Sequence, residues 1–349
     1  MKMNKLTKVG FSALCGSLAA VSAANAGDLT ATGGVDMSWV SLSNANTGNP
    51  IGIGSNITFK GSGELDNGWK FDLTIANKNG NAYSAAAVNL DMGGLGSLNL
   101  NSGDSGNGIA SIDDKMPTAW EEAWGAGLST GIKTVAGVGG AQHWAYTTPT
   151  IMGVTLEVAH APQMSQSDTA DKGAGGVATT TGAGWDGTIN VNPSMGTEIL
   201  SGLNLYVGAH YTSHNPNSTY EADVYEGVAG ITYDIGPISL GFGRSGFITG
   251  QENISAGHTH YKGGMYGIAF NVNDDLSISY GHHEMHQYDD QGSGRTDQWG
   301  DSLIEVNSWQ IAYTMGGASM RIAETKGENL FYTKGRDEEA TTISVALAF

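Results

Sequence analysis

The chain has 349 residues, with 34 acidic against 16 basic side chains and a formal net charge of −18. A chain this acidic lacks the basic face that nucleic-acid binders present, so no nucleic-acid partner is expected. The single cysteine, Cys15, excludes a fold held together by disulfide bonds.

Residues 1–26 have the pattern of a cleaved secretory signal. Lys2, Lys5 and Lys8 form a basic start, an apolar run follows, and Ala24-Asn25-Ala26 gives an A-x-A cleavage site. Cleavage removes three lysines, no acid and the only cysteine, so the formal charge moves from −18 to −21. The exported chain, residues 27–349, then contains no run of 18 apolar residues, which argues against spanning helices.

Alternation with a period of two residues runs through the rest of the chain. Ile57, Phe59 and Leu65 share one parity, and polar residues occupy the other; after the turn Asp66-Asn67-Gly68 the alternation resumes at Trp69. Sixteen strands are expected, in chain order: 29–43, 52–65, 69–78, 83–92, 96–102, 142–148, 153–160, 185–192, 202–213, 225–234, 238–248, 260–272, 276–287, 305–314, 318–326 and 340–349.

The connections alternate in length. Long polar segments such as 161–184 and 288–304 follow odd-numbered strands, and tight turns such as Gly236-Pro237 follow even-numbered ones. An even strand number with this asymmetry predicts an all-β fold, a sixteen-stranded antiparallel transmembrane β-barrel. A soluble β-sandwich explains the alternation equally well but not the asymmetry of the connections.

The last strand, 340–349, is expected to close the barrel against the first, since every backbone group in lipid must be paired. Ile343, Val345 and Leu347 would face lipid, and Phe349 would lie at the membrane interface as the closing C-terminal residue. The alternate positions are small or polar and would face inward.

The chain resembles the sixteen-stranded general porins of Gram-negative outer membranes. The strand number, the closing aromatic residue, the long segment after the fifth strand and the stretch HWAYTTPTIMGVTLEVAH at 143–160 carry the resemblance. It implies a homotrimer in which each subunit holds a water-filled pore, narrowed by the third external loop folded into the lumen. A barrel of this size is independently too wide for side chains to fill.

The segment 103–141 is the candidate constriction loop, because it is far too long for a simple connection. Within it TAWEEAWG, 118–125, predicts a short helix that starts with a capping-box spacing and places Trp120 and Trp124 on one face. The alternative is a solvated external loop. The acidic side chains expected at the pore are Asp104, Asp113, Asp114, Glu121 and Glu122.

Basic side chains with inward parity would oppose this loop, as the resemblance implies. They are Lys60, Lys70, Lys78 and Arg321. The alternative is that each lysine pairs with a neighbouring acid, for example Lys70 with Asp72 or Glu64.

The stretch HHEMHQYDD, 282–290, does not fit a zinc-protease motif, since its second histidine comes one place early. On a strand His282 and His283 point to opposite sides, so they are not expected to share a metal. No metal site, cofactor or catalytic set is expected.

The sequence therefore predicts a non-enzymatic general diffusion porin of the outer membrane, passing ions and small hydrophilic solutes with a weak preference for cations. A substrate-selective channel and a non-channel adhesin or enzyme barrel are the alternatives. Expected partners are further copies of the chain in a homotrimer, outer-membrane lipid and lipopolysaccharide, and the barrel-assembly machinery.

Overall fold

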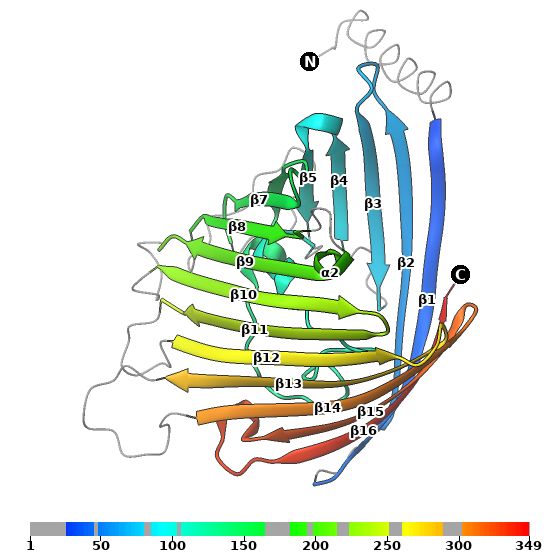
Figure 1. Cartoon of the computed structure of the whole chain (residues 1–349), viewed down its shortest axis with the longest axis vertical. Helices are drawn as coiled ribbons and strands as arrows, with labels where there is room; N and C mark the ends of the chain where they lie inside the picture. The colour runs from blue at the N-terminus through cyan, green and yellow to red at the C-terminus, as the bar shows by residue number, and fades with distance from the viewer. Residues whose placement is uncertain are drawn as a thin grey trace, which may run out of the picture.

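The computed structural model describes residues 26–44, 48–79, 85–102, 106–164, 182–193, 198–214, 223–250, 260–288 and 302–348. In this part of the chain, sixteen antiparallel strands form one closed barrel, with β1 hydrogen-bonded to both β2 and β16 (Figure 1). The strands are β1 Ala26–Leu42, β2 Ile51–Glu64, β3 Lys70–Lys78, β4 Ala85–Asp91, β5 Ser97–Ser102, β6 His143–Thr147, β7 Val154–Ala161, β8 Gly184–Val191, β9 Leu203–Thr212, β10 Val224–Ile235, β11 Ile238–Ile248, β12 His260–Asn271, β13 Leu276–Tyr288, β14 Ser302–Met315, β15 Ala318–Glu328 and β16 Glu338–Ala348.

The two faces of the wall differ as the alternation predicts. On β14, Trp309 is 65% exposed on the outside, whereas Ser308 and Gln310 beside it are buried on the inside. On β16, Ile343 and Leu347 point outward, and Ser344 is buried inward, where its hydroxyl donates to Asp36 at 2.6 Å. This arrangement suits a wall with lipid outside and polar surroundings inside.

Helical structure is short wherever the chain is described. It comprises one α-helix, α2 (Glu198–Ser201), in the β8–β9 connection, and short 3-10 turns. No described helix is long and apolar enough to cross a membrane.

The buried core lies between the β5–β6 loop and the inner wall. Two 3-10 turns of that loop, η2 (Gly108–Ile112) and η3 (Gly137–Gly140), lie against β8 and β9. Further along the loop, Ala123 packs on Ile304 and Val306 of β14. One apolar cluster joins loop residues to β9, β10 and β12: Ile109, Ile112, Met116, Val135, Tyr206, Val228 and Met265. The loop therefore covers the inner wall along β7–β16 and reaches the end of β1, where Leu128 of the loop lies in one apolar cluster with Val40 and Leu42.

Candidate functional site

The root of the loop is held by one buried carboxylate on β8. Asp186 accepts hydrogen bonds from the backbone N–H of Ile109, at 2.8 Å, and of Val138, at 3.2 Å. Its other oxygen contacts Nδ1 of His210 at 2.5 Å, and the side chains of this pair are at most 1% exposed. A single wall residue thus joins the two ends of the loop.

Two glycines permit this close approach. Gly108 and Gly137 both have positive φ, 68° and 52°, and a Cβ at either position would collide with the Asp186 carboxylate. Glycine adopts this backbone conformation without the steric cost that other residues carry.

The middle of the loop is held by an amide on β14. Gln310 Oε1 accepts from the backbone N–H of Trp120 at 3.1 Å and of Glu121 at 3.0 Å, and Gln310 Nε2 donates to the Glu121 carbonyl at 2.7 Å. On β13, the Ser279 hydroxyl accepts from the backbone N–H of Ala119 at 2.8 Å. These bonds tie the loop to the wall five and six strands away from β8, which carries Asp186.

The prediction of a helix over 118–125 is wrong. The segment forms turns and bends, in which the Thr118 hydroxyl accepts from the Trp120 N–H at 3.2 Å and Gly125 donates to the Glu122 carbonyl at 2.9 Å. Because Gln310 and Ser279 satisfy the backbone groups, no intrahelical bonds are needed. Trp120 and Trp124 consequently do not share a helical face.

Arg321 of β15 links the loop to β1, which is two strands along the wall. It points inward from β15, donates to Asp36 of β1 at 2.6 Å, and lies over the Trp120 ring at 4.9 Å from the ring centre. A guanidinium suits this position because it pairs with a carboxylate and stacks on an aromatic face at the same time.

Glu121 is a loop carboxylate whose pKa responds to these wall charges. Burial raises its pKa; Arg321 and Lys78 act in the opposite direction, and Asp114 and Asp36 add to the increase. Acids and bases from the loop, β1, β3 and β15 therefore lie close enough to influence one another.

The other loop acids lie close to one another. Burial, reinforced by repulsion from Asp114, raises the pKa of Asp113 to about 7 and that of Glu122 to about 7. Burial also raises the pKa of Asp114, whose side chain is more exposed than the other two. Asp113 and Glu122 share with His283 of β13 a narrow space of about 20 Å³, enough for about one water molecule.

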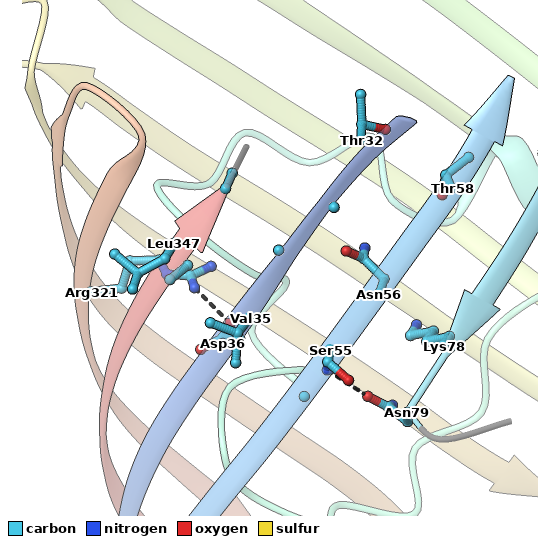
Figure 2. Close-up of a pocket in the computed structure, with 15 residues that line it drawn as sticks. Thr32, Val35, Asp36, Ser55, Asn56, Thr58, Lys78, Asn79, Arg321 and Leu347 are labelled. Carbon is cyan, nitrogen blue, oxygen red and sulfur yellow. Dashed lines mark hydrogen bonds and ion pairs between the residues drawn. The ribbon is translucent and has the colours of Figure 1, made fainter. Parts of the chain in front are cut away.

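The basic wall residues separate into two groups. Lys60 forms an ion pair with Asp72 at 3.2 Å, so this lysine pairs with a neighbouring acid. Lys78 and Arg321 instead line a recess of about 560 Å³ that opens beside Asp36 (Figure 2). Lys70, at the start of β3, does not line that recess.

Figure 2 shows this recess at the junction of β1, β2, β3 and the closing strands. Thr32, Asn56 and Thr58 add uncharged polar groups to its lining, and the Asp36–Arg321 pair lies at one side. The recess therefore carries uncharged polar groups and both signs of charge.

The anchors Asp186, Gln310 and Glu226 were not singled out from the sequence. Glu226 of β10 accepts from the backbone N–H of Ala136 at 2.7 Å and of Gly137 at 3.0 Å. Their signal in the sequence is a polar residue of inward parity on a strand, but many wall residues that do not bind the loop share this signal.

Asp104 and Phe349 lie outside the described residues, as does the signal segment up to residue 25.

Replacing Asp186 with alanine is expected to lower the free energy of unfolding by about 3–5 kcal/mol, because it leaves buried N–H groups unpaired. Denaturant unfolding of the folded protein in detergent measures the loss. The control is Asp72→Asn, which removes an exposed ion pair and should cost less than about 1 kcal/mol. Equal stability of the two variants would contradict the anchoring role.

Comparison with known proteins identifies one family and several solved structures with a similar fold. The model of the family described as Gram-negative porin matches residues 11–348. No curated protein sequence matches the chain. Among solved structures, the anion-selective porin from Comamonas acidovorans is 15% identical, with a TM-score of 0.64, over 92% of this chain and 99% of that chain.

Two further structures have the same fold. Salmonella typhi OmpF in complex with daunomycin is 12% identical, with a TM-score of 0.66, over 92% of this chain and 97% of that one. The trimer form of OmpT from Vibrio cholerae is 10% identical, with a TM-score of 0.62, over 93% of this chain and 100% of that one.

Proposed function

This chain belongs to the Gram-negative porin family and is an outer-membrane diffusion channel rather than an enzyme, and we propose that it is a general diffusion porin with a weak preference for cations. The pore runs between the β5–β6 loop and the inner face of β1–β4, beside the recess lined by Asp36, Lys78 and Arg321. The described part of that loop, 106–141, is its constriction. Ions and small hydrophilic solutes pass without an energy source.

The observation that carries the cation preference is the acidic edge of the loop. Asp113, Asp114, Glu121 and Glu122 all come from one short stretch, and the formal charge of the whole chain is −18. On the wall, Asp36 neutralises Arg321 through their ion pair at 2.6 Å. A narrow passage with excess negative charge raises the local concentration of cations.

The ion preference is tested by the reversal potential of single channels in a planar bilayer with a salt gradient. A reversal potential whose sign shows that cations are the more permeant ions supports the proposal. A reversal potential of the opposite sign overturns it. The anion selectivity of the Comamonas acidovorans porin does not bear on this chain, because a match at 15% identity shows a shared fold alone.

The preference is expected to weaken as the pH falls from about 8 to about 6. Asp113 and Glu122, each with a pKa raised to about 7, become neutral in that interval, so two of the loop carboxylates lose their charge. The permeability ratio of cations to anions should fall by about twofold. In the double variant Asp113→Asn, Glu122→Gln the permeability ratio should not change with pH. The same dependence on pH as in the wild type would show that these two carboxylates do not cause it.

We further propose a homotrimer in outer-membrane lipid and lipopolysaccharide, inserted by the barrel-assembly machinery. The trimer form of the OmpT structure supports this assembly by analogy of fold. The exposed apolar side chains on β1 and β2, such as Trp39 and Ile53, are available to lipid or to a neighbouring subunit. Light scattering of the unheated protein in detergent tests the number of subunits.

A further inference from the structure

The outer face of β13 and β14 carries polar side chains just beyond a row of aromatic rings. Tyr266, Tyr280 and Trp309 form this row, with ring centres 6.1 and 4.7 Å apart between neighbours. Rows of this kind mark the membrane interface of outer-membrane barrels, and the longer connections lie on the external side. His282 and Glu284 follow the row toward the long β13–β14 connection, so they lie at the level of the external head groups.

His282 presents one defined nitrogen to its surroundings. Its Nδ1 lies 2.8 Å from Oδ1 of Asn307, and that oxygen also accepts a hydrogen bond from the Tyr280 hydroxyl at 2.6 Å. An oxygen that only accepts requires the proton on Nδ1. The neutral ring then has its lone pair on Nε2, and a hydrogen bond of this kind is what typically orients a metal-binding imidazole.

Three glutamates lie side by side across the strands next to this nitrogen. Glu284 of β13 is in register with Glu305 of β14, which is in register with Glu328 of β15. Like charges directly opposite each other destabilise a sheet.

The two flanking glutamates, Glu284 and Glu328, are each neutralised by a basic side chain. Arg244 donates to Glu284 at 2.9 Å, and Lys326 lies 2.9 Å from Glu328. Arg244 reaches Glu284 by passing over Gly264, where a Cβ would lie 2.6 Å from its Nη1 atom. Within the described residues the central Glu305 has no ion-pair partner.

We propose that His282, Glu284 and Glu305 bind a divalent transition-metal ion of the Zn²⁺ class on the outer face of the barrel. Their ligand atoms lie within 4.8 Å of one another, and His282 Nε2 is 3.9 Å from Glu284 Oε2. Ligand atoms of a tetrahedral zinc ion are about 3.4 Å apart, so small side-chain rotations bring the three into range. The ion supplies the missing positive charge beside Glu305 and joins β13 to β14.

The chemistry of the ligands selects the class of ion. One imidazole with two carboxylates suits Zn²⁺ and its neighbours, whereas Ca²⁺ and Mg²⁺ take oxygen ligands. Three protein ligands leave one position for water.

The test is a titration of untagged, folded protein in detergent with Co²⁺, after removal of bound metal. Millimolar Mg²⁺ in the buffer occupies sites made of oxygen alone. One Co²⁺ per chain should bind with visible absorption bands, and Zn²⁺ should displace it. His282→Gln and Glu305→Gln should each weaken binding by about 100-fold, and Asn307→Ala by about 10-fold to 100-fold.

His286→Gln is the matched control, since His286 lies on the same strand and the same face outside the cluster, and it should bind as the wild type does. Single-channel conductance confirms that each variant is folded, because the site lies outside the pore. Equal binding by His282→Gln and wild type, or no visible bands in the wild type, overturns the proposal and leaves only the Arg244–Glu284 ion pair.

Discussion

A channel in which residues 103–141 are replaced by a short turn is expected to conduct on the order of twofold or more better than the wild type, because a sixteen-stranded wall alone leaves a wide aqueous lumen. The replacement is compatible with the barrel, since Asn101 of β5 is already in register with His143 of β6. The remaining strands keep all their hydrogen-bonded neighbours.

The same variant should lose most of its ion preference. The loop carries Asp113, Asp114, Glu121 and Glu122. Without it the charges that remain near the passage are those of the wall, where Asp36 and Arg321 neutralise each other and Lys78 is positive. Conductance and reversal potential are measured together in planar bilayers.

The control is a deletion within 251–258, between β11 and β12 in the chain, which should leave both quantities unchanged. The loop deletion also uncovers apolar wall side chains such as Ile304, which is fully buried in the intact protein. Heat-resistant mobility in gel electrophoresis therefore has to confirm folding first. A folded deletion variant with wild-type conductance would mean that this loop does not set the width of the pore.

The strands could be predicted from the sequence because their signal is local. Sixteen were expected, and the described residues form sixteen, with ends that differ by at most three residues. Even the weakly patterned stretch 185–192 corresponds to β8 at Gly184–Val191. Alternation with a period of two follows from the geometry of a strand between lipid and water, so each segment carries its own evidence.

The loop could not be predicted in the same way because its conformation depends on distant residues. Gln310 lies 189 positions after Glu121 and binds its backbone in place of a helical partner. Capping and spacing rules describe isolated helices, and they fail where the wall satisfies the backbone groups. The proposed metal ligands show the same limit, since Glu305 comes next to Glu284 only through the register of two strands.

Arg321→Ala is expected to shift the reversal potential toward cations and to increase the current noise of the open channel. The substitution removes a positive charge beside Glu121 and leaves Asp36 without its ion-pair partner. It also removes the stacking on Trp120, one of the contacts that hold the middle of the loop. A cation–π contact of this kind contributes about 0.5–2 kcal/mol, so the loop should fluctuate more without detaching from Gln310 and Ser279.

Arg321→Lys separates these two effects. A lysine keeps the charge but has neither the planar face that stacks on Trp120 nor the forked geometry that pairs with Asp36. The reversal potential of this variant should therefore stay close to that of the wild type, while the noise increases as it does in Arg321→Ala. If both quantities instead follow the wild type in the lysine variant, Arg321 acts only through its charge, and the loop is positioned by Gln310 and Ser279 alone.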